Sequence, residues 1–337
     1  MTAPTVLPTR ESGVTDAQWA RIVADLTRRG FLAGTAAAAL ALAGCAGGTG
    51  PAAPGAPSGD RRAVSTPQGD YDIPVDPQRV VAIDSRVDLE PAVALGLPLI
   101  GYTNRTAQPW IPLPDGVPLL SQIPDVEQIL GLEPDLIICT KLEQESEYWP
   151  ISRLQEVAPV LPVEYSLTWQ ENLRRIAGWL GRPDAAETAI GEYDAAVADV
   201  RARHADAISG STVIGVTYSP EEGRLWGTSL QGVEFEQPAG AVLRDLGGRT
   251  LDTALFADDT SLAMENIEVL EAADAILFAD SREDPLLDRL RTQPLWQQLP
   301  AVRAGRVAVQ YGDTYFGGGY TSAYVLQGWD DTFATLA

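Results

Sequence analysis

Three short runs of consecutive apolar residues recur in the first half of the chain, each bounded by Pro, Gly or Asp. They lie at 79–84, 97–102 and 135–140. Continuous apolar runs of this length are typical of strands buried on both faces of a parallel sheet. Apolar residues at helical spacing lie between them, at 88–95 and after Pro124-Asp125, where the aspartate can cap a helix. This alternation predicts an α/β lobe at residues 70–168.

The second half of the chain repeats the pattern. Apolar runs recur at 212–218, 275–280 and 306–310, and helical spacing recurs at 239–246, at 267–272 and from residue 324 onward. The repeat predicts a second α/β lobe at residues 210–337, again with a mainly parallel sheet flanked by helices.

Residues 169–209, between the two lobes, show no strand pattern. After a break at 181–183, apolar residues follow one another at steps of three and four: Ile190, Tyr193, Val197, Val200, His204 and Ile208. This stripe predicts one long helix that joins the lobes, with His204 as a partly buried helix residue rather than a metal ligand. Two such lobes leave a cleft between them, and ligands of open parallel sheets bind at the carboxyl ends of strands.

The N-terminus carries the features of an export signal. Arg28-Arg29 precede an apolar run at 31–43, whose thirteen residues are fewer than the roughly 20 that a membrane span needs. The run ends in small residues before Cys45, as in the box at which bacterial lipoproteins are cleaved and acylated. We expect a twin-arginine signal peptide at 1–44, and a lipidated Cys45 with a flexible tether rich in Ala, Gly and Pro at 45–69. The alternative is an Ala-rich buried helix with a chance cysteine.

These features predict an extracytoplasmic protein anchored to the outer face of the cell membrane by the lipid on Cys45. The composition excludes several other partners. Lys plus Arg number 24 against 46 Asp plus Glu, a net charge of -22, and the chain from Cys45 onward keeps 20 bases and 43 acids. Nucleic acid and anionic membrane surfaces are therefore poor partners for the body of the protein.

Few residues are available for metal or thiol chemistry. His204 is the only histidine, and Cys45 and Cys139 are the only cysteines, so neither a four-ligand zinc site nor a disulfide framework can form. Cys139 lies inside a predicted buried strand and is expected to act as a small hydrophobic side chain. Zinc or manganese capture is disfavoured because a single histidine cannot supply the imidazole ligands that such sites usually need. No resident cofactor is expected.

The usual enzyme motifs are missing from the sequence. It contains no Gly-x-Gly-x-x-Gly after a strand, no Walker sequence and no Gly-x-Ser-x-Gly elbow. The glycines at 317–319 can cradle an anion, but they lack a lysine, and a mobile loop is the favoured interpretation. The sequence therefore favours a binding function over catalysis.

Several segments in order along the chain resemble the iron-complex substrate-binding lipoproteins of ABC importers, which bind ferric siderophores, haem or cobalamin. In the first lobe these are 77–84, Leu89-Glu90, 94–96 and 126–138; in the second lobe they are 243–248, 264–266, 273–278, 296–299 and 301–307. The resemblance covers roughly residues 70–335. It implies a sheet in each lobe, one linking helix, little hinge motion, and a monomer that delivers a ferric siderophore to an ABC permease with its ATPase.

The resemblance also implies two docking residues. Glu127 and Glu265 occupy the positions at which the family's two lobes carry glutamates that meet arginines of the permease, and Glu268 is a neighbour that can substitute for Glu265. Both lie in the first turn of a predicted helix, where the helix dipole favours a carboxylate. Ordinary first-turn stabilisation is the alternative explanation.

Candidate ligand-binding residues lie in loops after the predicted strands and combine aromatic faces with hydroxyl and guanidinium donors. They are Arg86, Tyr102, Trp110, Tyr218, Trp226, Tyr311 and Tyr315, with Phe316 beside the last. Arg86 is the strongest candidate, because a charged residue directly after a buried strand needs an anionic partner. Near the cleft, the sequence places few further cations, namely Arg105, Arg224 and Arg282. Because so few cations are available to pair with an anion, the chelate is expected to carry little negative charge, as hydroxamates do.

Other functions stay open from the sequence. Haem binding through a tyrosinate, cobalamin binding, and a sensing or adhesion lipoprotein with the same fold are all compatible with it. A secreted enzyme on a two-lobed scaffold is a further alternative, since 43 acids bring some carboxylates close together.

Overall fold

The computed structural model describes residues 60–83, 87–103, 108–141, 145–164, 166–232, 236–257 and 260–337. Ala63–Ile73 and Pro77–Ala337 form the larger of the two units into which the chain divides. The predicted signal peptide and Cys45 lie outside the described residues. The two lobes described below both belong to the larger unit.

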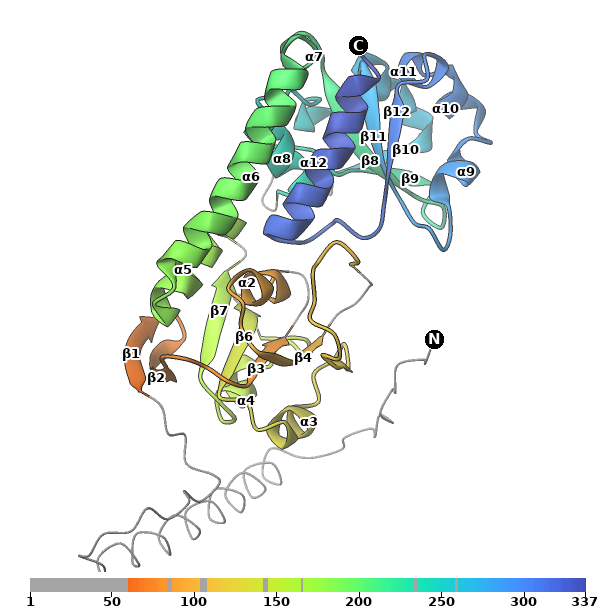
Figure 1. The fold of residues 1–337 in the computed structure, drawn as a ribbon. Helices are drawn as coiled ribbons and strands as arrows, with labels where there is room; N and C mark the ends of the chain where they lie inside the picture. Colours follow the sequence, from red (N-terminus) through yellow and green to blue (C-terminus); the bar gives the residue numbers. More distant parts are fainter. Residues whose placement is uncertain are drawn as a thin grey trace, which may run out of the picture. The chain divides into compact units, whose positions relative to one another are not determined.

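The first lobe contains a five-stranded sheet whose strands are all parallel (Figure 1). Its order is β5 (Leu119–Leu120), β4 (Leu99–Thr103), β3 (Val80–Ile83), β6 (Leu136–Lys141) and β7 (Val160–Glu164). Helices α2 (Leu89–Ala94), α3 (Val126–Gly131) and α4 (Ile151–Leu154) accompany it. All four residues of β3 are buried, as expected for a central strand covered on both faces. The three strands predicted here are confirmed, and Cys139 is fully buried in β6.

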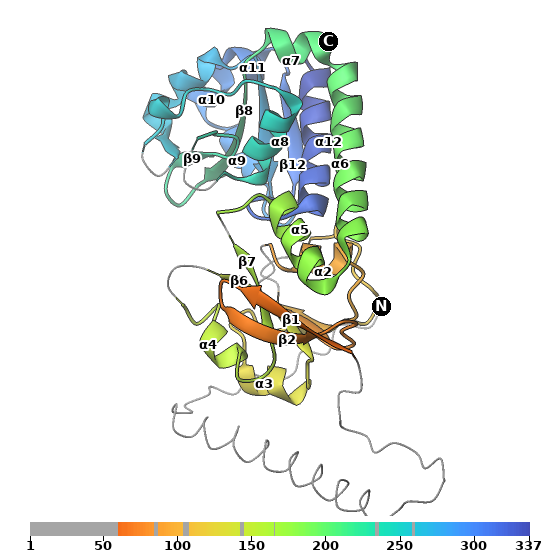
Figure 2. The same ribbon diagram turned by 90° about the vertical axis from the view of Figure 1, so that its left-hand side faces the viewer.

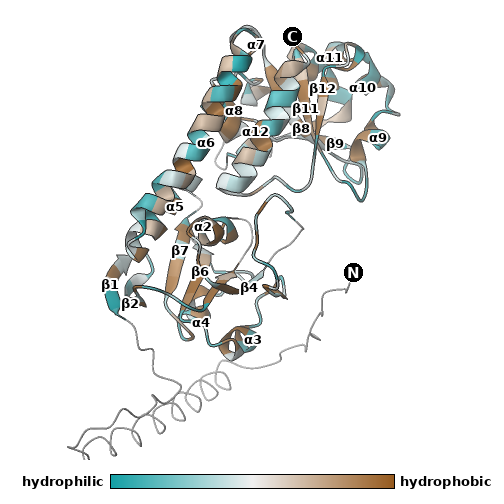
Figure 3. Ribbon diagram, viewed as in Figure 1, coloured by the Kyte–Doolittle hydropathy of each residue, from teal (hydrophilic) through white to brown (hydrophobic). Residues whose placement is uncertain are grey.

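The second lobe contains another five-stranded sheet. Its order is β10 (Ser261–Ala263), β9 (Arg224–Gly227), β8 (Val213–Ser219), β11 (Ala275–Asp280) and β12 (Val307–Tyr311). Strands β8, β11 and β12 are parallel, whereas β9 pairs antiparallel with both β8 and β10. The sheet is therefore parallel in its predicted part and antiparallel at one edge. Figure 3 shows that the strands of both sheets are predominantly hydrophobic.

Helices α8 (Pro238–Leu246), α9 (Leu286–Leu290), α10 (Pro294–Gln298), α11 (Pro300–Arg303) and α12 (Gly319–Ala334) belong to this lobe, with the 3-10 helices η1 (Thr253–Leu255) and η2 (Met264–Ala272). Two predictions need correction. The helix expected at 267–272 is a 3-10 helix, and the last helix begins at Gly319 rather than at residue 324.

The connecting region consists of α5 (Trp169–Leu180), α6 (Pro183–Arg203) and α7 (Ala205–Gly210). Gly181 ends α5 in the left-handed conformation at φ +69°, and Pro183 begins α6, so the predicted break is confirmed. The long helix ends earlier than predicted, because His204 has φ -118° and ψ 25°, which separates α7 from α6.

Helix α6 contributes to the cores of both lobes. Ile190 packs in the first-lobe core, while Tyr193, Val197 and Val200 pack in a core of the second lobe. Figures 1 and 2 both show α6 beside α12. The apolar stripe therefore joins the lobes by packing against both of them.

The start of the folded region differs from the prediction. Strands β1 (Arg61–Thr66) and β2 (Gly69–Pro74) form a two-stranded sheet, so residues 61–69 are not part of a flexible tether. Val64 lies between exposed neighbours and Ile73 follows an exposed one, and both bury their side chains in the first-lobe core. That burial offsets the entropy cost of ordering the segment.

Candidate functional site

A cavity of about 920 Å³ lies at the carboxyl ends of β8, β11 and β12. Pro109 and Trp110 of the first lobe line it, and the other lining residues come from the second lobe. Its aromatic lining consists of Trp110, Tyr311, Tyr315 and Tyr324, and its polar lining includes Thr217, Thr228 and Gln237. The cavity therefore occupies the position that the strand pattern predicts for a ligand cleft.

Trp110 is held by residues of the second lobe. Its indole Nε1 donates a hydrogen bond of 2.9 Å to Thr321 Oγ1, and its ring stacks on Tyr324 with centroids 4.3 Å apart and planes 7° from parallel. Gly312 packs beneath the ring with φ +110°, and a Cβ there would lie 2.7 Å from Trp110 Cζ3. These contacts fix the indole as the first-lobe wall of the cavity.

The charged lining of the cavity is mostly acidic. Among the described lining residues, Arg282 is the only cation, and its guanidinium lies 4.5 Å above the centre of the Tyr311 ring. Three acids accompany it: Asp280, Glu283 and Asp313. The described lining therefore carries more negative than positive charge.

Asp280 already has internal hydrogen-bond donors. Its side chain is nearly buried and accepts hydrogen bonds from the backbone N–H groups of Ser281 at 2.8 Å and Leu286 at 2.6 Å. These bonds anchor the turn that leads into α9. The exposed Glu283 and the partly buried Asp313 are the other acids in the described lining of the cavity.

The structure brings together three of the predicted ligand-binding residues, Trp110, Tyr311 and Tyr315. The nearby Arg282 also lines the cavity, while Phe316 packs edge-to-face against Tyr315 with centroids 4.6 Å apart. Tyr315 is 40% exposed and so has an accessible ring. Arg86 and Arg105 lie outside the described residues.

Other predicted ligand residues lie elsewhere. Tyr218 packs in the core of the second lobe and is only 7% exposed, so its assignment to the cleft is wrong. Thr217, which precedes it on β8, lines the cavity, and successive side chains of a strand point to opposite faces.

Tyr102, Trp226 and Arg224 are also not among the described lining residues. Tyr102 packs against the first-lobe core, where burial raises its pKa. Trp226 and Arg224 lie on β9, a strand that the sequence analysis did not predict. Trp226 Nε1 donates to Glu222 Oε2 at 3.2 Å, and Arg224 Nε donates to Ser261 Oγ at 2.7 Å.

The two proposed docking glutamates are both exposed. Glu127 lies in the first turn of α3, whose N-cap Asp125 accepts hydrogen bonds from the N–H groups of Glu127 and Gln128. Glu265 lies in the first turn of η2, a 3-10 helix that is kinked at Asn266. The helix dipole therefore stabilises the Glu265 carboxylate less than the predicted α-helix would. Glu268 is exposed on the same segment.

Glu90 in α2 is a buried polar residue whose role the sequence pattern does not reveal. Its side chain is 2% exposed, and its carboxylate accepts hydrogen bonds from Tyr320 N at 2.7 Å, Thr321 N at 3.1 Å and Thr321 Oγ1 at 2.5 Å. These donors belong to the first turn of α12, which has no side-chain cap of its own. Burial raises the pKa of Glu90, although these hydrogen bonds oppose the rise.

The glycine run at 317–319 permits the close contact between Glu90 and the start of α12. A Cβ at Gly318 would lie 3.1 Å from Glu90 Oε2, and one at Gly319 would lie 3.0 Å from the Trp169 ring. The run is therefore not the mobile loop that the sequence favoured. Its small residues let the first-lobe carboxylate approach the backbone N–H groups of α12.

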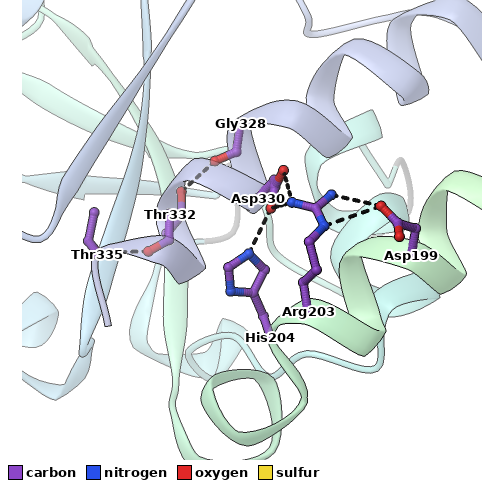
Figure 4. Close-up of polar contacts among 7 residues, drawn as sticks. All are labelled: Asp199, Arg203, His204, Gly328, Asp330, Thr332 and Thr335. Atoms are coloured by element: carbon purple, nitrogen blue, oxygen red, sulfur yellow. Dashed lines mark hydrogen bonds and ion pairs between the residues drawn. The ribbon is translucent and has the colours of Figure 1, made fainter. Parts of the chain in front are cut away.

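His204 forms a polar cluster away from the cavity (Figure 4). Its Nε2 lies 2.7 Å from Asp330 Oδ1, and Arg203 donates to the same carboxylate at 2.6 Å. Burial favours the neutral form of Asp330, but the hydrogen bonds from Arg203 and His204 outweigh burial and lower its pKa. The cluster joins the end of α6 to α12, in agreement with a structural role for His204.

The described part of the chain offers neither a metal-binding cluster nor a helix suited to span a membrane. It contains no group of three or more His, Cys, Asp or Glu side chains placed to hold a metal ion. Within the same residues, no helix combines the length and the apolar character needed to cross a membrane.

Residues 120–311 match the family model described as periplasmic binding protein. The chain belongs to this family. Its members are binding proteins and not enzymes, so the enzyme alternative is excluded, and the resemblance inferred from the sequence is confirmed.

This binding protein is similar in sequence to two proteins of Bacillus subtilis. The protein named probable siderophore-binding lipoprotein YfiY is 25% identical over 289 residues, which cover 80% of this chain and 86% of the relative. The iron(3+)-hydroxamate-binding protein YxeB is 22% identical over 271 residues, covering 76% and 80%. Both relatives align over most of their own length.

A crystal structure of a periplasmic solute-binding protein from Mycobacterium smegmatis superposes with a TM-score of 0.69. It is 21% identical, and the match covers 82% of this chain and 99% of that one. This likeness confirms the two-lobed α/β fold.

Proposed function

We propose that this binding protein captures a ferric siderophore outside the cytoplasm and delivers it to an ABC importer. The observation that carries the proposal is the 920 Å³ cavity at the strand ends, lined by four aromatic rings from both lobes. Broad aromatic faces suit a bulky, amphipathic chelate. Family membership and the names of the relatives support the same function.

The charge of the cavity favours a hydroxamate chelate. Glu283 and Asp313 face the ligand with only Arg282 as a cation among the described lining residues. A carboxylate about 8 Å from the iron centre contributes about 2 kcal/mol of repulsion per unit of negative ligand charge at an effective dielectric constant of about 20. This repulsion disfavours triply anionic catecholates, whereas a neutral hydroxamate complex experiences none and a cationic one is attracted. Relatives at 22–25% identity do not select a chelate class, so the choice rests on this charge.

The proposed ligand contacts are Trp110, Tyr311 and Tyr315, with Arg86 as the donor to the hydroxamate oxygens. The three aromatic residues line the cavity, and Tyr315 is the most accessible of them for covering the aliphatic linkers of the chelate. Arg86 keeps its proposed role from its position three residues after the end of strand β3.

Titration with a panel of ligands tests the proposed function. The domain starting at Asp60 is titrated with ferrioxamine B, ferric enterobactin, ferric citrate, haem and cobalamin, and tryptophan fluorescence is followed. We expect ferrioxamine B to bind tightest, by more than about tenfold or 1.4 kcal/mol. Tighter binding of enterobactin or citrate would refute the charge argument, and preferential binding of haem or cobalamin would refute the siderophore assignment.

A matched pair of variants locates the binding site. Tyr315→Ala removes a 40% exposed ring from the cavity, whereas Tyr148→Ala removes a 38% exposed ring that is not among its described lining. We expect only the first substitution to weaken ferrioxamine B binding. Equal effects of the two variants would place the ligand elsewhere.

We also propose that Glu127 and Glu265 dock the two lobes onto the permease. Both carboxylates are exposed and neither lines the cavity, so they are available to a partner without affecting the ligand. Interface charges of this kind mainly govern encounter and orientation.

Membrane anchoring through an acylated Cys45 is a further part of the proposal. The twin arginines, the short apolar run and the small residues before Cys45 support it. The Ala-, Gly- and Pro-rich composition of residues 46–60 suits a tether between the lipid and the folded region.

A further inference from the structure

Three residues from the two lobes form a continuous chain of hydrogen bonds that ends at the cavity. Glu90 of α2 accepts a hydrogen bond from the hydroxyl of Thr321 in α12, and the same hydroxyl oxygen accepts a hydrogen bond from the indole N–H of Trp110. Helix α2 contacts the start of α12 (Figure 1). The buried carboxylate is therefore connected through one hydroxyl group to the first-lobe wall of the cavity.

We propose that Glu90 and Thr321 are positioning residues that determine where the Trp110 indole lies and thereby set the width of the ligand cavity. This inference rests on the proposed function of that cavity. Neither residue lines the cavity in the described structure, so both act through Trp110.

The directions of the hydrogen bonds give Thr321 this role. An indole nitrogen can only donate, so the Thr321 hydroxyl oxygen accepts from Trp110, and its own hydrogen is directed to Glu90 Oε1. Tyr320 N and Thr321 N hold the Glu90 carboxylate from the other side. The carboxylate therefore orients the hydroxyl, and the hydroxyl orients the indole.

The remaining contacts of Trp110 do not replace this bond. The stack on Tyr324 and the backbone of Gly312 restrain the ring plane, but sliding of stacked rings past each other preserves much of their attraction. A directional hydrogen bond at 2.9 Å restrains that sliding. Because Pro109 and Trp110 are the first-lobe residues in the described lining, displacement of the indole changes the space between them and the second lobe.

Three substitutions in α12 separate positioning from general stability. Thr321→Val removes the hydroxyl while keeping the shape, and Thr321→Ser restores the hydroxyl. Thr332→Val is the matched control, since Thr332 is also fully buried in α12 and its hydroxyl donates to Gly328 O at 2.7 Å, without contacting Trp110. Each variant is labelled with ¹⁵N-tryptophan, and the indole signal of Trp110 is assigned by its loss in Trp110→Phe.

We expect Thr321→Val to shift the Trp110 indole proton upfield, to speed its exchange with solvent, and to weaken ferrioxamine B binding about fivefold, the effect of losing one hydrogen bond of ordinary strength. Thr321→Ser and Thr332→Val should leave the signal and the affinity near their wild-type values. Glu90→Gln should shift the same indole signal, because its effect passes through Thr321.

An unchanged indole signal in Thr321→Val would overturn the hydrogen-bond chain. A shifted signal with wild-type affinity would overturn the role in shaping the cavity, as would an equal loss of affinity in Thr332→Val. If the wild-type protein does not bind ferrioxamine B, the proposed ligand class is wrong, and the indole signals still decide whether Glu90 and Thr321 position Trp110.

Discussion

Gly312→Ala is expected to destabilise the protein by a mechanism that depends on Trp110. Gly312 has φ +110°, and a new Cβ would lie 2.7 Å from Cζ3 and 2.9 Å from Cη2 of the indole, closer than Cβ atoms approach other heavy atoms. The left-handed backbone costs an L-residue roughly 1–2 kcal/mol. Displacing the restrained ring adds about 1–3 kcal/mol, as in other overpacked sites.

A double-mutant cycle separates these two contributions. Unfolding by urea is followed by circular dichroism for Gly312→Ala, Trp110→Ala and the double variant. We expect the free energy of unfolding to fall by about 2–5 kcal/mol in the first variant. Once the indole is absent, the same change should cost only the backbone part, which leaves a coupling energy of about 1–3 kcal/mol.

Gly116→Ala provides the control for the backbone part alone. Gly116 has φ +82°, and nothing lies within 4 Å of a Cβ built there. We expect a loss of roughly 1–2 kcal/mol. Additivity of the Gly312 and Trp110 substitutions within about 0.5 kcal/mol would refute the proposed packing of the indole against the glycine.

Four further predictions follow from the charged groups and the N-terminus. Burial raises the pKa of Glu90, so its protonation stabilises the folded state below about pH 4.5 and this contribution is lost as pH rises through the folded-state pKa. The stability of wild type minus that of Glu90→Gln, measured by urea unfolding, should therefore fall from pH 4.5 towards neutrality; a constant difference would contradict the burial argument. Asp330 has a lowered pKa, so Asp330→Asn should cost about 1–2 kcal/mol at neutral pH, with the loss shrinking as pH falls below about 4. An equal loss at pH 3 and pH 7 would show that its charge is unimportant. Replacing both Glu127 and Glu265 by Ala should abolish uptake of the chelate by cells while preserving affinity, and weaker binding by the isolated variant would place them at the ligand. Cys45→Ala should move the protein from the membrane fraction to the soluble or precursor pool, which cell fractionation and immunoblotting would detect; unchanged attachment would rule out the lipid anchor.

Local sequence determined the central strands of both sheets. Strands β3, β6, β8 and β11 lie inside their sheets, and their residues are apolar in succession because both faces are covered. The edges were harder to predict. Strand β7 contains Pro162, which an edge position tolerates, and β5 has only two residues.

The candidate site was predicted only in part from the order of residues along the chain. Trp110, Tyr311 and Tyr315 follow strands and reach the cavity, because the carboxyl ends of parallel strands share one edge of the sheet. Strand β8 extends to Ser219, however, and its alternation directs Thr217 to the cavity and Tyr218 to the core. Whether a side chain near a strand end points to the cavity or to the core depends on the residue at which that strand stops.

Only the tertiary structure revealed the role of Glu90. Its hydrogen-bond donors lie 230 and 231 residues further along the chain, at the start of a helix in the other lobe. The sequence alone shows an acid between Leu89 and Pro91 in an apolar helix, with no sign of its partner. Apolar periodicity determines which faces are buried, because hydrophobic burial is non-directional and averages over many residues. A buried carboxylate instead needs specific donors at hydrogen-bond distance, and the packing of the two lobes supplies them.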